Sequence, residues 1–472
     1  MVERARKTAH FRVVIVSGNV YVEKYRPAIQ SRDVFTLWGI LQLIRLYPGR
    51  LPDLDIMFDC DDVPVVRSRD FVGPTANPPP LFRYCADEWS LDIVFPDWSF
   101  WGWAETNIRP WSSTWKGIKE GNKKRRWEER VPYAYWRGNP HVAATRRDLL
   151  RCNVSEKADW STHLYIQNWD QESRQGFKQS NLEDQCTHRY KIYIEGWAWS
   201  VSEKYIMACD SMTLLIRPRY YDFFMRGMLP LHHYWPIQNT HKCTSLKFAV
   251  HWGNSHTQKA QAIGKAGSSF IEEDLKMDYV YDYMFHLLNE YTKLLKFKPA
   301  VPPGAVEFCS ETMACTANGT WKSFMLESMV MAPSHTAPCT MHPPYHPSAL
   351  QDFLEKKANS TRQVEMWENE YWEKRKQLLQ HSLKQTENHT SSTSVKDDGN
   401  GDCDHDGGDD NEVQCSFSSK WTTVMAWSVG AAGNGDDGEE SGAGGMGGKV
   451  EGGRRVVSGA VVSELLLGLH EE

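Results

Sequence analysis

The chain has 472 residues, a formal net charge of −6 and 41% hydrophobic residues. This length predicts two or three domains rather than one, and the hydrophobic content is sufficient for a sizeable core. The net negative charge, with no Lys/Arg stripe that carries interleaved aromatics, argues against a nucleic-acid partner. No stretch reaches the roughly 18 apolar residues that a membrane span needs.

The first hundred residues have the pattern of an α/β domain. Val13–Val16 and Asn19–Val22 are predicted strands, and the apolar spacing of Arg32–Leu46 predicts a helix. Leu54–Phe58 is another predicted strand, and an acidic run at residues 59–62 follows it directly. Carboxylates at the carboxyl end of a strand in an α/β domain lie where ligands gather.

An aromatic segment follows the next predicted strand, Leu91–Phe95. It contains Trp98, Trp101 and Trp103, three of the 20 tryptophans in the chain. Indole rings pack most often in cores, but their flat faces also stack on sugar rings and bases. The pattern alone leaves both interpretations open.

A second α/β region begins near residue 131. Tyr133–Trp136 is a predicted strand that leads into Arg137-Gly138-Asn139, and a helix is predicted from Thr145. Residues 159–185 are polar and predicted to be a surface insertion.

A strand, turn and helix follow this insertion. The alternation over Tyr190–Ile194 predicts a strand, which Gly196 ends, and Ser200 with Glu203 has the spacing of a capping box before a helix. Thr213–Ile216 is the next predicted strand. The turn would present helix N–H groups to a phosphate. Such turns occur throughout α/β proteins, however, and neither GxGxxG nor a P-loop Lys-Ser/Thr pair is present.

The remainder of the chain contains predicted helices and then a tail of different composition. Residues 257–275 and 278–297 are predicted helices, and Gln363–His381 is a predicted charged helix. From Lys384 onward Gly, Asp, Ser and Thr dominate without apolar periodicity, so residues 384–472 are predicted to be a disordered tail.

Two segments together, residues 135–148 and 188–237, resemble the Rumi-type protein O-glucosyltransferases. That family includes fungal capsule-associated glycosyltransferases, and the variant here is closest to its plant branch. The resemblance covers residues 53–297, with plant-like similarity to about residue 381. It implies an α/β fold of GT-B type, with two facing Rossmann-like domains, C-terminal helices and the disordered tail.

The expected domain organisation follows from this resemblance. Residues 1–132 would form an acceptor domain, truncated at its start, and residues 133–298 would form the domain that binds a UDP-sugar. Residues 299–383 would be an extension with a helix, before the tail at 384–472.

The resemblance also implies an activity: inverting transfer of glucose or xylose from a UDP-sugar to a hydroxyl of a protein or glycan acceptor. Such a transfer needs a base for the hydroxyl proton, cationic groups for the leaving diphosphate, and a cleft that excludes water. Asp62, in Asp62-Val63-Pro64, matches the family's catalytic Asp. The alternative is that Asp62 only starts a turn before the proline.

The donor-binding residues are transferred from the family's motifs by position. Arg147, of the pair Arg147-Asp148, is the leading diphosphate ligand, because a guanidinium suits phosphate oxygens; the alternative is a surface Arg paired with Asp148. Animal members carry Arg at the position of Ser202, a missing contact for which Lys204 could compensate. The full donor set comprises Arg137, Gly138, Asn139, Arg147, Gly196, Trp197, Ser200, Ser202 and Lys204, and the aromatic residues expected to line the cleft are Trp98, Trp101 and Trp103.

The resemblance implies no metal, although the sequence contains two DxD patterns, Asp53-Leu54-Asp55 and Asp59-Cys60-Asp61. In single-domain glycosyltransferases DxD holds a divalent cation, but the pattern is too short to be specific. Two alternatives therefore stay open: a metal-dependent DxD transferase, and an inactive, truncated member that only binds sugar.

Eleven cysteines without zinc spacing and four Asn-X-Ser/Thr sequons fit the lumen of the secretory pathway, Golgi or endoplasmic reticulum. Cys309 and Cys315 are a candidate disulfide. Plant relatives usually carry an N-terminal anchor, and its absence suggests that this chain begins inside the family's usual sequence. We expect the protein to act as a monomer.

Overall fold

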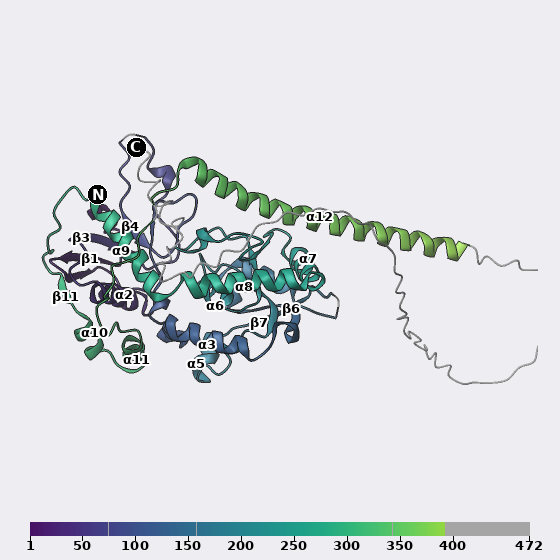
Figure 1. The fold of residues 1–472 in the computed structure, drawn as a ribbon, viewed down its shortest axis with the longest axis horizontal. Coiled ribbons are helices and arrows are strands. Elements are labelled where there is room, and N and C mark those ends of the chain that lie inside the picture. The colour runs from purple at the N-terminus through teal and green to yellow at the C-terminus, as the bar shows by residue number, and fades with distance from the viewer. Residues whose placement is uncertain (74, 157, 342, 392–472) are drawn as a thin grey trace, which may run out of the picture. The chain divides into compact units, whose positions relative to one another are not determined.

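The computed structural model describes residues 1–391, except residues 74, 157 and 342. Residues 1–374 form one compact unit, in which helices pack around two β-sheets, so the predicted α/β class is confirmed (Figure 1). None of the helices in the described part of the chain is both long enough and apolar enough to cross a membrane.

The first sheet is mixed and has the order β11-β2-β1-β3-β4-β5. Its strands are β1 (Phe11–Val16), β2 (Asn19–Lys24), β3 (Leu54–Phe58), β4 (Leu81–Arg83), β5 (Ile93–Val94) and β11 (Val306–Phe308). β1 runs antiparallel to β2 and β3, whereas β3, β4 and β5 are parallel. Ser17 and Gly18 form the β1–β2 turn with positive φ at both positions, as a two-residue hairpin favours.

The second sheet has the order β10-β9-β8-β6-β7, and all its neighbouring strands are parallel. Its strands are β6 (Val131–Gly138), β7 (Thr162–Ile166), β8 (His188–Tyr193), β9 (Met212–Ile216) and β10 (Trp235–Ile237). β6 is the first strand of this sheet in the sequence. β7 lies on one side of β6, and β8, β9 and β10 follow in order on the other side. The strand order therefore reverses between β6 and β8, a topological switch point where α/β sheets bind ligands.

One prediction for this region is wrong. Residues 159–185 are not a surface insertion, because they supply β7 and the short helix α5 (Trp169–Arg174). β7 is an edge strand with two exposed positions, so it lacks the apolar run of a buried parallel strand.

Helices pack around both sheets, and several of them connect consecutive strands (Figure 1). They are α1 (Val2–Ala5), α2 (Arg32–Leu46), α3 (Trp111–Lys123), α4 (Ala144–Leu149), α5 (Trp169–Arg174), α6 (Ser202–Met207), α7 (Lys242–Ser255), α8 (Thr257–Asp274), α9 (Met277–Lys293), α10 (Ser310–Thr316), α11 (Gly319–Glu327) and α12 (Pro347–Ser391). The predicted helices at 32–46, 257–275 and 278–297 are confirmed within a few residues. The predicted charged helix is longer than expected, so residues 384–391, assigned to the tail, are helical; the rest of the tail, 392–472, lies outside the described residues.

A single hydrophobic cluster joins the two sheets. It includes Phe58 of β3, Tyr205 of α6 and Met284 of α9. The Tyr291 hydroxyl donates a hydrogen bond to the Asp55 carbonyl oxygen at 2.9 Å, which fixes α9 against the first sheet. This shared core gives the two halves a packed connection on one side of the candidate site.

Two disulfides link segments around the second sheet: Cys152, after α4, is bonded to Cys243 of α7, and Cys186, before β8, is bonded to Cys209, after α6. The candidate pair Cys309 and Cys315 is not bonded, so that prediction is wrong. Instead, the Cys309 sulfur accepts a hydrogen bond from the Thr312 backbone N–H at the start of α10.

Candidate functional site

A pocket of about 580 Å³ opens at the switch point of the second sheet. Its second-sheet wall is formed by the last residues of β6, the segment after β8, and α6. Its other wall comes from the first part of the chain, including Arg32, Asp62 and Trp98. The pocket is therefore lined by both halves, as a site that joins a donor to an acceptor requires.

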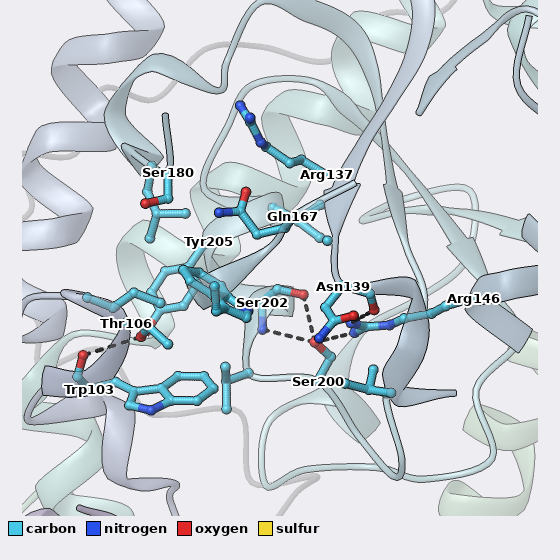
Figure 2. A pocket seen from close by; sticks show the side chains of 18 of the residues that line it. Trp103, Thr106, Arg137, Asn139, Arg146, Gln167, Ser180, Ser200, Ser202 and Tyr205 are labelled. Carbon is cyan, nitrogen blue, oxygen red and sulfur yellow. Dashed lines mark hydrogen bonds between the residues drawn. The ribbon is translucent and has the colours of Figure 1, made fainter. Parts of the chain in front are cut away.

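The structure brings most of the predicted site residues to this pocket. Those in its lining are Asp62, Trp98, Trp103, Arg137, Gly138, Asn139, Gly196, Trp197, Ser200 and Ser202. Figure 2 shows Arg137 near one end and Asn139, Ser200 and Ser202 toward the other, with Trp103 facing them from the first half. Three predicted residues, Arg147, Lys204 and Trp101, are absent from the lining.

Asp62 is held by a buried arginine at the start of α2. Arg32 Nη1 donates to Asp62 Oδ1 at 2.9 Å and to the Cys60 carbonyl oxygen at 3.0 Å. The guanidinium lies 4.4 Å from the centre of the Trp98 ring, an arrangement that fixes its plane. The Asp62 side chain is 28% exposed. A carboxylate that has one oxygen fixed and is partly open to the pocket can act as a base.

Arg146 of α4 holds the turn between β8 and α6 through hydrogen bonds. Arg146 Nη2 donates to Ser200 Oγ at 3.0 Å, and its Nε donates to the Glu195 carbonyl oxygen at 2.8 Å. Ser200 and Ser202 share a hydroxyl hydrogen bond of 2.8 Å (Figure 2). Burial lowers the pKa of Arg146 to about 10, so the guanidinium is charged at neutral pH. Its hydrogen bonds go to backbone carbonyl oxygens and to the Ser200 hydroxyl, and the nearby charges of Tyr193 and Glu195 oppose the lowering of its pKa.

Arg147, the predicted diphosphate ligand, lies elsewhere. Its Nη1 donates to the His141 carbonyl oxygen at 3.3 Å in an exposed position. Asp148, its predicted alternative partner, instead pairs with Lys242 at 2.7 Å. The helical turn of about 100° per residue separates Arg146 and Arg147 onto different faces of α4, and only Arg146 faces the pocket.

Lys204 and Trp101 belong to the core instead of the pocket. Lys204 Nζ lies 3.2 Å from Asp97 Oδ2 and 2.8 Å from Ser99 Oγ. Burial lowers the pKa of Lys204, but the charges of Asp97, Tyr205 and Asp222 and the hydrogen bond to Asp97 together outweigh burial, so the pKa is raised. Trp101 is fully buried; its indole lies so close to Gly39 of α2 that a Cβ there would be 2.4 Å from the ring.

The predicted capping box is wrong. α6 begins at Ser202, one residue later than a Ser200 cap would place it, and its N-cap residue is Val201. Glu203 is buried, and neither of its carboxylate oxygens has a hydrogen-bond partner in the described part of the chain. Burial, together with the charge of Asp222, raises the pKa of Glu203 well above its usual value.

Sequence reasoning missed a large part of the pocket. The segment from β7 to β8, read as an insertion, supplies Gln167, Trp169, Asp170, Ser173, Ser180, Leu182 and Gln185. Two further lining residues, Arg32 and Lys191, are cations in elements that were predicted as a helix and a strand. The local signal for β7 was the presence of residues that favour strands, Thr162, Tyr165 and Ile166.

Neither DxD pattern lines the pocket. Asp55 is paired with Arg12, and Asp59 is paired with Arg83. One nitrogen of His10 and oxygens of Asp59 and Asp61 lie within 4.8 Å of one another, a grouping that could hold an ion. Arginines already neutralise these carboxylates: Arg26 binds both, at 3.2 and 2.9 Å. This cluster fits a charge network of the fold better than a divalent-cation site.

Sequence comparisons find a family model and several known proteins that are similar to this chain. The model of glycosyl transferase family 90 matches residues 1–368. Protein O-glucosyltransferase 1 of Rattus norvegicus is 26% identical over 274 residues, which cover 55% of this chain and 66% of the rat protein. The O-glucosyltransferase rumi homolog of Aedes aegypti is 25% identical over 315 residues, 63% of this chain and 74% of that protein. O-glucosyltransferase rumi of Drosophila melanogaster is 25% identical over 275 residues, 55% of this chain and 65% of that protein. The matched part of the chain thus spans about two thirds of the rat and fly proteins.

Proposed function

Because the chain belongs to glycosyl transferase family 90, we propose that it transfers a sugar, glucose or xylose, from a UDP-sugar to a hydroxyl of a protein or glycan acceptor. The observation that carries this proposal is one pocket with Asp62 on one wall and the Arg146-supported turn on the other. The relatives named as O-glucosyltransferases favour glucose and a protein acceptor.

The proposed reaction is a single displacement with inversion at the anomeric carbon. The acceptor oxygen forms its bond to that carbon as the bond to the diphosphate oxygen breaks, and UDP leaves with the bonding electrons. Asp62 accepts the proton of the acceptor hydroxyl. The Arg32 contact to Oδ1 supports this role, because it fixes the carboxylate while the side chain remains 28% exposed.

The leaving diphosphate would be stabilised by the turn at the start of α6. Arg146 supplies positive charge, and the hydroxyls of Ser200 and Ser202 supply hydrogen-bond donors. Arg146 thus replaces Arg147 in this proposal, and Lys204 has no direct role. We propose that these groups and the backbone N–H groups of the turn act without a divalent cation.

We also propose a GT-B arrangement, in which residues 1–132 bind the acceptor and residues 133–298 bind the donor, and a monomer as the active form. The parallel second sheet with its switch point supports the donor-binding half. The lumen of the secretory pathway is the proposed compartment, supported by the disulfides Cys152–Cys243 and Cys186–Cys209, because disulfides persist in oxidising compartments.

The test is to incubate the full chain with a panel of UDP-sugars, with and without EDTA, and to measure UDP release and transfer to an acceptor library. We expect release from UDP-glucose or UDP-xylose that EDTA leaves unchanged. Loss of activity in EDTA would favour a metal-dependent transferase instead. No release with any donor, despite sugar binding, would favour an inactive binding protein.

A further inference from the structure

Lys191 of β8 is a buried cation in the pocket lining. Lys191 is 2% exposed, and among the described residues its Nζ donates one hydrogen bond, to the Cys209 sulfur at 3.4 Å. That sulfur belongs to the Cys186–Cys209 disulfide and is a weak acceptor. In the described part of the chain, no carboxylate forms an ion pair with Lys191. Burial lowers the pKa of this lysine to about 7, and the charge of Arg130 contributes.

A second unused donor lies on the same face of the sheet. Gln167 is 4% exposed, and its Nε2 has no hydrogen-bond partner in the described residues. The register pairs Tyr135 with Lys191 and Arg137 with Tyr165. Because side chains alternate along strands, Lys191, Tyr135 and Arg137 face the same way, and Gln167, two residues after Tyr165, joins them. Figure 2 shows Gln167 beside Arg137, with Ser180 opposite.

Lys191 and Gln167, which we call the floor of the pocket, therefore carry N–H donors without oxygen acceptors among the described residues. A buried ammonium group that binds only a sulfur atom costs free energy, which a bound acceptor oxygen would offset. The complementary ligand is a flat group with ring carbonyl oxygens, since Tyr135 provides an aromatic surface 5.8 Å from the ammonium group.

The position of this floor relative to the proposed chemistry identifies the ligand. If the sugar faces Asp62 on the first-half wall and the diphosphate lies at the turn of Ser200 and Ser202, the base of the nucleotide has to lie on the far side of the diphosphate. Lys191 and Gln167 belong to the second sheet and to the segment after β7, on that side.

We propose that Lys191, with Gln167, selects the base of the donor nucleotide by donating hydrogen bonds to a ring carbonyl oxygen. This inference rests on the proposed function and deepens it. Uracil carries a carbonyl oxygen at ring position 4, where cytosine carries an amino group. An ammonium group accepts no hydrogen bond, so Lys191 favours the keto base and disfavours the amino base.

The test is calorimetric titration of the full chain with UDP and with CDP. The wild-type protein is expected to bind UDP at least about tenfold more tightly than CDP, the size of one hydrogen bond to a charged group. Lys191→Met should weaken UDP binding by about tenfold and leave CDP binding nearly unchanged. Gln167→Leu should weaken UDP binding less. Lys123→Met, at an exposed lysine of α3 paired with Glu120, is the matched control and should change neither affinity.

Thermal unfolding distinguishes this role from a structural one. Unliganded Lys191→Met should melt at or above the temperature of the wild type, because it removes an unpaired buried cation. Equal affinities of the wild type for UDP and CDP would overturn the proposal without any variant. An unchanged UDP/CDP ratio in Lys191→Met would overturn it too, while leaving the proposed function intact. A wild type that binds no UDP would instead remove the proposed function itself.

Discussion

Two buried lysines of the second half have different partners and opposite pKa shifts. Lys204 on α6 and Lys191 on β8 are 1% and 2% exposed. Lys204 binds Asp97 and Ser99, and its pKa is raised, whereas Lys191 contacts a disulfide sulfur and burial lowers its pKa to about 7. A buried charge with a carboxylate partner is part of the fold. One without such a partner, in a pocket wall, remains available to a ligand.

The largest effect is expected at Lys204. Lys204→Met should lower the free energy of unfolding by about 3–5 kcal/mol, because it leaves the Asp97 carboxylate buried without its partner. Urea unfolding followed by fluorescence measures this loss. Adding Asp97→Leu to Lys204→Met should recover part of it. A loss below about 1 kcal/mol, as for an exposed pair, would contradict the structural role assigned to this lysine.

Arg146 and Arg147, the neighbouring arginines of α4, differ in the same way at the candidate site. Arg146→Gln should raise the KM for the UDP-sugar by about tenfold or more, because a hydrogen bond to a charged group is worth about 1.5–3 kcal/mol. Arg147→Gln is the matched control and should change KM by less than about twofold, since its exposed guanidinium contacts a backbone oxygen outside the pocket. Steady-state kinetics at fixed acceptor concentration measure both. A larger effect at Arg147 would restore the original sequence prediction.

The pH dependence of stability distinguishes Lys191 from the paired lysine. Its folded-state pKa of about 7 lies below the value of 10.5 for an unhindered lysine. The unfolded chain therefore binds an extra proton between pH 7 and 10.5, and the contribution of Lys191 to stability rises with pH in that window. The slope approaches about 1.4 kcal/mol per pH unit. Comparing urea unfolding of wild type and Lys191→Met across this range should show the slope missing from the variant; parallel curves would contradict it.

A smaller effect of opposite sign is expected at Glu195. Burial raises its folded-state pKa to about 7 from 4.5, although the backbone N–H groups of Arg219 and Tyr220 bind the carboxylate. The folded chain thus holds an extra proton between pH 4.5 and 7, and this contribution to stability falls as pH rises through that window. Glu195→Gln should flatten the fall, as measured by thermal melts at pH 5, 6 and 7. A variant whose melting temperature follows that of the wild type would contradict it.

The sequence predicted the elements with strong periodicity and much of the pocket. The helix at 32–46, strand β3 and the strand before Gly196 were all correct, because each has a local apolar pattern. Strand β7 was missed because an edge strand with exposed side chains resembles a polar loop. Because β7 was not predicted, Gln167 and the segment up to Gln185 were not included in the predicted site.

The roles of individual cations could not be predicted in the same way. Arg146 and Arg147 are adjacent and chemically identical, and the rotation of a six-residue helix decides which one faces the pocket. Lys204 matched a basic position of the resembled family, but its partner Asp97 lies 107 residues away in the sequence. Ion-pair partners this far apart in the sequence can be identified only from the three-dimensional structure.

The central claim is that Asp62 removes the acceptor proton in a pocket that holds the donor nucleotide elsewhere. The most direct measurement compares wild type and Asp62→Asn for sugar transfer and, by calorimetry, for UDP affinity. We expect transfer to fall by about 10²- to 10⁴-fold, the usual contribution of a general base, while UDP affinity stays within about twofold, because the Arg146-supported turn is unchanged. Transfer at the wild-type rate by Asp62→Asn would contradict the account.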